Sequence, residues 1–523
     1  MSGSEESRGV GYGGDRGKFT EKGQDPEIGY VSSGDNIAHG TSSAAVGNSI
    51  FAKIQRLTGG VELRGIERVP EDERTDSSMR QAGTLWLSAN MVVSSLAIGV
   101  LAYPVFGLRF LASALTIVFI NLLGILPVCF FSTFGPRFGL RQMVLSRFYF
   151  GYNGVKLIAI FNILACLGWS AVNVIVGASL LHAVGSGRLP GYGGILIIAA
   201  ATLLICTFGY RFVHAYERWS WVPSFVVFLV VLGAFARSGD FYTGNEEPIP
   251  AAAVEAGAVL SFAASVFGFA TGWTSYAADY TVYQPSGRSR TSVFFWTFGG
   301  LFLPLCFTEL LGAAVGSAVR EGSAYADAYA QSAVGGLLWQ VLAPRVGAGF
   351  AYFCLVVLAL SIVANNCPNI YSVGLSLQVL VSPAESRVPR PVWTALGTAI
   401  YVAVAIPGYD HFEASLEAFM LVIAYWLAVY EGVALTEHFI FRRGIGGYRP
   451  EDYATPSKLP PGFAALAAFA VGAAGAVLGM SQEWFQGPIG ALAGGDIGFE
   501  LAFPFAAVSY VALRTVEKRY FKI

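Results

Sequence analysis

Twelve apolar runs, each long enough to cross a lipid bilayer, dominate the sequence. A membrane-spanning helix needs about 20 mostly apolar residues, and such runs cover approximately 84–103, 110–131, 155–182, 193–209, 219–236, 254–279, 292–316, 347–378, 392–406, 415–440, 462–480 and 500–516. The composition agrees, because only 13% of the 523 residues are charged, against about 25% in soluble domains. The sequence therefore predicts an all-α integral membrane protein with twelve transmembrane helices.

The charged residues divide the chain into polar tails and a membrane body. Residues 1–83 are predicted to form a cytosolic N-terminal tail, largely disordered over 1–60, where Gly, Ser and charged residues prevail. The transport body is predicted over 84–516, followed by a cytosolic C-terminal tail at 517–523. Lys and Arg concentrate in the loops on one side of the body, which places both termini in the cytosol.

Several other classes of protein lack support in the sequence. A net charge of -1 and the absence of a basic arm argue against nucleic-acid binding. The chain has no His-Glu-x-x-His, Gly-x-Ser-x-Gly or Gly-x-x-x-x-Gly-Lys-Ser/Thr motif, so we expect neither an enzyme nor an ATP-driven pump, and no cofactor or metal. The six cysteines lie apart in apolar stretches and are interpreted as small buried hydrophobes. Twelve spans with short loops favour a carrier in the lipid bilayer.

Polar side chains near the centres of four runs are candidates for a binding site. At membrane depth a polar group costs free energy unless it is paired or lines a cavity. These candidates are Ser94 and Ser95 in the first run, Trp169 and Asn173 in the third, Trp273 in the sixth, and Asn365 and Asn366 in the eighth.

Trp169 and Asn173 are four residues apart and therefore share one face of a helix. An indole beside an amide suits a flat heterocycle, because the ring can stack while the amide offers both a donor and an acceptor. Alternatively, Trp169 belongs to an interfacial aromatic belt and Asn173 bonds a neighbouring helix. Trp169 lies near the middle of its run, where belts do not occur, which favours the functional interpretation.

Gly268 and Gly272 lie in the middle of the sixth run, just before Trp273. Such a pair is typical of a broken membrane helix whose freed backbone groups line a cavity. The same spacing fits close helix packing equally well. The sequence leaves both interpretations open.

The eighth run carries two adjacent amides, Asn365 and Asn366, shortly before Pro368. Neighbouring side chains on a helix point about 100° apart, so we expect at least one amide to face a central cavity and the other to support the helix near the proline. Ser94 and Ser95 are weaker candidates, since a serine hydroxyl can bond a carbonyl of its own helix.

Three carboxylates lie within or at the ends of predicted spans: Asp279, Glu309 and Glu431. A proton-driven carrier can use such a group as its proton site. Each is equally compatible with a structural pair or an interfacial position, so the sequence does not choose among them.

The polar clusters occupy equivalent positions if the first five spans and the next five are inverted repeats. Specific motifs accompany them: Glu-Leu-Arg-Gly-Ile-Glu-Arg-Val-Pro at 62–70, Gly-Leu-Arg-Gln-Met at 139–143, Ser-Arg-Phe at 146–148, Gly-Trp-Ser at 168–170, Gly-Trp at 272–273, Ala-Asp-Tyr-Thr at 278–281 and Asn-Asn-Cys-Pro-Asn-Ile-Tyr-Ser at 365–372. From about residue 62 to the C-terminus, the chain resembles the nucleobase:cation symporter-1 family, specifically its fungal purine-cytosine permease branch.

The resemblance implies a leucine-transporter-type fold with five-plus-five inverted repeats and two further C-terminal helices. The first repeat would cover 84–240, the second 254–440, and the extra helices 462–516. The resemblance also implies import of cytosine and purine bases (adenine, guanine, hypoxanthine) by proton symport with alternating access, at the plasma membrane.

The resemblance also implies roles for individual residues. Trp169 and Trp273 would stack on the base, while Asn173 and one or both of Asn365 and Asn366 would hydrogen-bond it. Ser94 and Ser95 match only loosely.

Sodium-coupled relatives place neighbouring hydroxyl residues shortly before the eighth-helix asparagine, whereas here that stretch has only Ser361. Sodium binding requires several hard oxygen ligands, so this departure favours a proton as the coupling ion.

Two other functions remain open on the sequence. A carrier of another planar heterocycle, such as vitamin B6, would use the same stacking and amide pairing. A nutrient sensor that binds the base without transporting it would use the same site. The oligomeric state is also left open.

Overall fold

The computed structural model describes residues 65–76, 78–185, 187–207, 216–244, 251–381 and 390–521. The segment predicted to be disordered, 1–60, lies outside the described residues. Within these ranges the only strands are β1 (Ser481–Gln482) and β2 (Phe485–Gln486), which pair antiparallel. The all-α prediction is confirmed.

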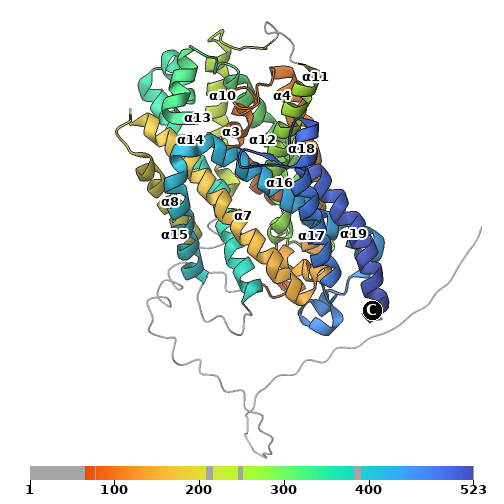
Figure 1. The fold of residues 1–523 in the computed structure, drawn as a ribbon. Coiled ribbons are helices and arrows are strands. Elements are labelled where there is room, and N and C mark those ends of the chain that lie inside the picture. Colours follow the sequence, from red (N-terminus) through yellow and green to blue (C-terminus); the bar gives the residue numbers. More distant parts are fainter. Residues whose placement is uncertain are drawn as a thin grey trace, which may run out of the picture. The chain divides into compact units, whose positions relative to one another are not determined.

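Helices occupy all twelve predicted apolar runs (Figure 1). In chain order they are α2 (Met79–Asn90) with α3 (Val93–Val100), α4 (Phe110–Ser132), α7 (Arg147–Val184), α8 (Gly191–Thr207), α10 (Trp221–Ala236), α11 (Ala252–Thr271) with the 3-10 helix η2 (Thr274–Tyr280), α12 (Arg290–Gly316), α14 (Ala348–Leu380), α15 (Arg390–Gly408), α16 (Phe412–Thr436), α17 (Phe463–Gly479) and α19 (Gly498–Phe521).

Within the described ranges, nine helices are long and apolar enough to cross a membrane, and the bent pair α2/α3 makes a tenth. The other two predicted runs form the shorter apolar helices α8 and α17, which have 17 residues each. A helix of that length lies at the lower limit for a membrane span.

Two membrane helices are interrupted near their middles. Helices α2 and α3 meet at a bend of 53° around Met91 and Val92. Helix α11 ends at Thr271, and the chain passes through Gly272 and Trp273 into η2. The second interruption lies at the Gly268 and Gly272 pair, for which the sequence left a helix break and close packing both open.

The two glycines of the sixth span have different roles. Gly268 lies against the main chain of Met420 on α16, which leaves no room for a Cβ atom, so it is a packing glycine. Gly272 lies at the break itself, beside the ring of Trp169. Both interpretations of the Gly-x-x-x-Gly spacing therefore hold, one for each glycine.

Helix α13 (Ala324–Val346) has no counterpart among the predicted runs. It lies between the seventh and eighth spans and packs on α7 and α14 (Figure 1). Its backbone departs from helical geometry at Ser332 and Ala333, and Ala333 has a positive φ of 44°. The helix escaped prediction because it is interrupted and because Asp327 and Arg345 shorten its apolar stretch.

The last part of the predicted N-terminal tail is packed against the helices. Val69 is fully buried and donates its main-chain N–H to the carbonyl of Gly139 at 2.8 Å. The guanidinium of Arg74, 5% exposed, donates to the carbonyls of Val69 and Pro136. Because its main chain is paired in this way, the ordered body begins well before residue 84.

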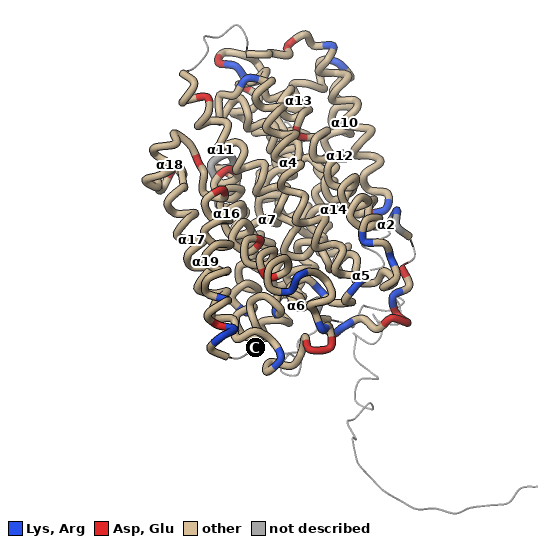
Figure 2. The backbone as a smooth tube through the Cα atoms, turned by 90° about the vertical axis from the view of Figure 1, so that its right-hand side faces the viewer, with Lys and Arg blue, Asp and Glu red and all other residues tan. Residues whose placement is uncertain are grey.

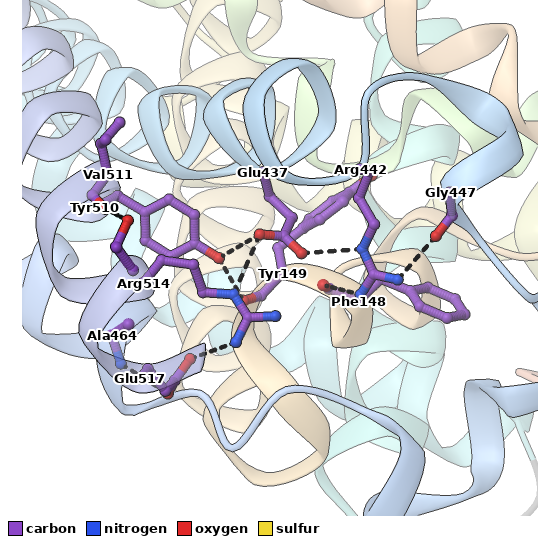
Figure 3. Close-up of polar contacts among 11 residues, drawn as sticks. Phe148, Tyr149, Glu437, Arg442, Gly447, Ala464, Tyr510, Val511, Arg514 and Glu517 are labelled. Atoms are coloured by element: carbon purple, nitrogen blue, oxygen red, sulfur yellow. Dashed lines mark hydrogen bonds and ion pairs between the residues drawn. The ribbon is translucent and has the colours of Figure 1, made fainter. Parts of the chain in front are cut away.

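Charged residues gather toward the ends of the helices (Figure 2), and many Lys and Arg lie at the end that carries α5 (Phe134–Phe138), α6 (Gln142–Leu145) and the C-terminus. There a buried network holds α19 to α16 (Figure 3). Glu437 accepts from Arg442 Nε at 2.9 Å, from Arg514 Nε at 3.3 Å and from the Tyr510 hydroxyl at 3.0 Å. Removing one partner of such a buried ion pair is strongly destabilising, because the remaining charge is left buried without compensation.

Helices α3 and α12 approach so closely that small residues are required on both. Gly99 of α3 lies against the main chain of Glu309, and Gly312 of α12 lies against the main chain of Leu96. Neither position has room for a Cβ atom. This reciprocal contact anchors the second half of the interrupted first span.

We expect Gly312→Leu to separate α3 from α12, because added side-chain volume in a packed contact costs about 1–3 kcal/mol. The amount of folded protein, measured by size-exclusion chromatography of a fluorescent fusion, should fall sharply. Gly299→Leu is the matched control, because Gly299 is on the same helix and has no other atom within 4 Å of a built Cβ. Equal amounts of both folded variants would contradict this account of the helix contact.

Candidate functional site

The two helix breaks lie against the middle of α7 and α14, and buried polar side chains from all four segments meet there. Asn173 of α7 is the centre of this group. Its Oδ1 accepts a hydrogen bond from Ser94 Oγ on α3 at 2.6 Å. Its Nδ2 donates to Asn365 Oδ1 at 2.7 Å and to Asn366 Oδ1 at 2.9 Å, both on α14. We call Ser94, Asn173, Asn365 and Asn366 the amide cluster; none is more than 3% exposed.

Asn365 and Asn366 are adjacent on α14, and their side chains share one hydrogen-bond partner. Both amide oxygens accept from the same atom, Asn173 Nδ2. The separation of about 100° applies to the directions in which the two Cβ atoms leave the helix. An asparagine side chain rotates about two further bonds, so two adjacent amides can reach one donor that lies between them.

The amide cluster also satisfies the main chain at the break between α2 and α3. Asn365 Nδ2 donates to the carbonyl of Ala89 at 2.6 Å. One turn earlier on α14, Ser361 Oγ accepts from the main-chain N–H of Val93 at 3.2 Å. Ser95 Oγ donates to the carbonyl of Asn90 at 2.8 Å, so Ser95 bonds the main chain of its own interrupted span.

The two predicted indoles lie on different sides of the sixth-span break. The ring of Trp169 makes edge contacts with Phe269 and Phe419, each with centroids 5.2 Å apart. Trp273 makes edge contacts with Trp86 at 5.4 Å and Tyr276 at 5.7 Å. In the described part of the chain neither indole has a parallel stacked partner.

Sequence reasoning missed several residues that complete this region. Asn90 accepts at Oδ1 from Trp273 Nε1 at 3.1 Å and thereby joins the two breaks. The hydroxyl of Tyr276 donates to Asn369 Oδ1 at 2.7 Å, and Asn369 Nδ2 donates to the carbonyl of Asn365 at 3.2 Å. A usable signal was present, because Asn90 is an amide within the first apolar run, only four residues before Ser94.

The three predicted carboxylates lie at three separate places, each with its own partners. Asp279 Oδ1 accepts from the main-chain N–H of Gln142 at 2.7 Å, next to α6. Glu309 accepts from Asn121 Nδ2 at 2.7 Å, between α12 and α4. Glu431 of α16 accepts from the hydroxyl of Thr271, the last residue of α11.

Asp279 belongs to a group of buried polar side chains next to α6. Arg141 Nη1 donates to the main-chain carbonyl of Asp279 at 2.8 Å. Gln142 Nε2 donates to the hydroxyl of Tyr430 at 2.9 Å, and the same hydroxyl bonds Ser146 Oγ at 2.8 Å. These hydrogen bonds connect α6 to η2 and α16.

Residues 68–500 match the family described as permease for cytosine/purines, uracil, thiamine, allantoin. The chain belongs to this family. It is thus a multi-pass membrane permease rather than an enzyme, in the nucleobase:cation symporter-1 group.

Among curated relatives, the permease is 55% identical to the purine-cytosine permease fcyB of Emericella nidulans, over 94% of this chain and 96% of that one. It is 31% identical to the vitamin B6 transporter TPN1 of Saccharomyces cerevisiae, over 88% of each. Among solved structures it is similar to Mhp1, a nucleobase-cation-symport-1 family transporter in a closed conformation with bromovinylhydantoin bound. The TM-score is 0.66 at 15% identity, covering 87% of this chain and 95% of Mhp1. This likeness confirms the predicted leucine-transporter-type fold.

We expect Asn173→Ala to destabilise the permease in the absence of substrate, because it leaves buried polar groups on α3 and α14 unpaired at about 1–3 kcal/mol each. The melting temperature in detergent should fall well below that of the parent chain. Ser170→Ala is the control, since Ser170 is equally buried on α7 and bonds only the Cys166 carbonyl of its own helix. Equal melting temperatures for the two variants would contradict a central role for Asn173.

Proposed function

We propose that this permease imports cytosine and purine bases across the plasma membrane by proton symport, with both termini in the cytosol. The substrate class is supported by 55% identity to a purine-cytosine permease along nearly the whole chain, against 31% to a vitamin B6 transporter. In this proposal the repeats at 84–240 and 254–440 each open with an interrupted helix, and the base binds where the two interruptions meet.

One observation supports base binding at the amide cluster more than any other. Asn366 is fully buried, and its Nδ2 has no hydrogen-bond partner among the described residues. A buried donor without a partner is costly in a folded protein. A ring nitrogen or carbonyl oxygen of cytosine or a purine is an acceptor of the right kind for this donor. Asn366 is therefore assigned to the base, while Asn365 is committed to the main chain at Ala89.

The indoles supply the second half of base recognition. Trp169 and Trp273 flank the sixth-span break, and their ring contacts within the described ranges are all edge contacts. A planar base can therefore add a parallel stacking contact, which is the favourable geometry for a heterocycle on an indole. Ser94 and Asn173 hold the amides in place beside it.

The contacts of Ser361 support the proton as the coupling ion. Its oxygen accepts from Val93 N–H and its hydroxyl donates to the carbonyl of Leu358 at 2.6 Å. This single hydroxyl is engaged with the main chain, whereas sodium needs several hard oxygen ligands.

We expect uptake of radiolabelled cytosine or adenine, in a strain without base carriers of its own, to rise as external pH falls. A protonophore should abolish the accumulation, and removal of sodium should not change it. Excess cytosine, adenine or hypoxanthine should compete and pyridoxine should not. Sodium-dependent uptake would contradict the coupling ion, competition by pyridoxine alone would contradict the substrate class, and binding without accumulation would indicate a sensor.

We expect Trp273→Ala to raise the apparent KM for the base about five- to 150-fold, since base stacking on an aromatic ring contributes about 1–3 kcal/mol. Trp273→Phe keeps a ring and should keep partial uptake. Trp339→Ala is the control, because Trp339 stacks on Tyr352 at the far end of α13. Uptake kinetics should be normalised to the carrier at the cell surface. Equal losses in the two Trp273 variants would indicate a purely structural role.

A further inference from the structure

Glu431 is bonded to the break in the sixth span. The residue is 2% exposed on α16, and its Oε1 accepts from the hydroxyl of Thr271, where α11 ends. The Thr271 hydroxyl lies 3.0 Å from the hydroxyl of Thr274, where η2 begins. Trp273, assigned above to base stacking, lies between these two threonines. The carboxyl is therefore connected to both ends of the break through two hydroxyls.

Glu431 also lines a cavity of about 560 Å³ between α4, α11, α12, α16 and α19. Apart from Glu431 and Glu500 its lining is apolar, and it opens to the outer surface, where Leu123 and Phe439 are 48% and 60% exposed. Glu500 of α19 lines the same cavity, and its Oε2 has no partner among the described residues. Gly498 lies against Tyr425 and Gly432 against Phe503, so α16 and α19 run side by side in the same direction (Figure 1). Glu500 is therefore within about one helical turn of the level of Glu431.

Buried glutamates among the described residues differ in their partners, and they are Glu217, Glu309, Glu431, Glu437 and Glu517. Neither carboxyl oxygen of Glu217 has a partner among these residues, and Glu517 is paired with Arg514. Glu437 forms ion pairs with Arg442 and Arg514 (Figure 3). Glu309 receives its hydrogen bond from the Asn121 amide nitrogen, which only donates. Glu431 is bonded by a hydroxyl, which donates to a carboxylate and accepts from a carboxylic acid. The Thr271 hydroxyl can therefore serve both protonation states of Glu431 by reversing the direction of the hydrogen bond.

We propose that Glu431 takes up and releases the coupling proton, and that Thr271 and Thr274 transmit its protonation state to the break beside the base. This proposal rests on the proposed function. The proton enters from the external water, Glu500 gives it a second carboxyl in the cavity, and it leaves to the cytosol with the base. When Glu431 gains the proton, its hydroxyl donates to Thr271, and Thr271 can then donate to Thr274. Loss of the proton reverses this order.

The ionisable groups around Glu431 include no paired cation. Among the described residues no Lys, Arg or His forms an ion pair with it, and none lines its cavity. Helix α19 presents Glu500, and α17 has no ionisable side chain. The neighbouring Tyr430 lies within electrostatic reach of Glu431, of Asp279 on η2, and of Tyr149 on α7. His438, farther along the same chain segment, packs against Phe130 and bonds Tyr448. A negative charge on Glu431 thus has no ion-pair partner among the described residues, and its named donor is the Thr271 hydroxyl.

The experiment compares accumulation with exchange in vesicles that contain the purified full chain. Accumulation of labelled cytosine is measured under an inward proton gradient, and base-for-base exchange is measured without one. We expect Glu431→Gln to exchange base but to lose accumulation above the external concentration, with no response to pH. Glu255→Gln, a carboxyl change in the first turn of α11, should accumulate base as the parent chain does.

Several outcomes would overturn the assignment. Accumulation by Glu431→Gln with the pH profile of the parent chain would do so. Loss of both exchange and accumulation, in a variant that folds in normal amount, would also do so. If Glu309→Gln exchanged base without accumulating it, and Glu431→Gln did not, the proton site would be Glu309 instead. Failure of the parent chain to transport any base would instead overturn the proposed function, which is a separate result.

A second pair of variants keeps the proposal testable if Glu431→Gln does not fold. Thr271→Val removes the hydroxyl and leaves the carboxyl, and it should flatten or shift the pH profile of uptake. Thr271→Ser restores the hydroxyl and should restore the parent profile. Identical pH profiles for the valine variant and the parent chain would overturn the proposal.

Discussion

The structure depends on how it satisfies main-chain groups that an interrupted helix exposes in the middle of a membrane. Water is absent there, so each freed N–H or C=O needs a partner from the protein. At the first-span break the carbonyl of Ala89 is bonded by Asn365 and the N–H of Val93 by Ser361. Both partners come from α14. The pairing between the first and eighth spans is therefore a requirement of the break itself, and it fixes where the polar cluster forms.

This requirement also gives the two adjacent asparagines different partners. Asn365 uses its nitrogen for the Ala89 carbonyl and its oxygen for Asn173, so both ends of its amide are bonded to the protein. Asn366 uses only its oxygen, for the same Asn173 nitrogen. The residue that holds the helix and the residue that is available to a ligand are thus neighbours in sequence. Their roles differ because the Asn365 nitrogen is bonded to a main-chain carbonyl of α2, at Ala89.

Much of this arrangement could be predicted from the sequence, because membrane depth makes polar residues conspicuous. The apolar runs located the helices, and the polar residues inside them located the four segments that meet. Asn90 and Tyr276 could not be chosen, because their importance lies in contacts with Trp273 and Asn369 across large sequence separations. Likewise, nothing local to Glu437 indicates that Arg514, 77 residues away, is its partner. The kinked α13 was missed because it lacks the continuous apolar stretch on which the prediction relies.

A proton site outside the base site can still be tightly coupled to it. If protonation of one group changes the affinity for a base, binding of the base changes the proton affinity of that group by the same factor. The coupling needs an element with two arrangements that both ligands distinguish. In the proposal above, the sixth-span break is this element, because the indole of Trp273 lies between two threonines whose hydroxyls lead to Glu431. A rigid, continuous helix at this point would transmit neither the protonation of Glu431 nor the binding of the base. In this proposal, the break that costs free energy in the membrane is therefore also the element that couples the two sites.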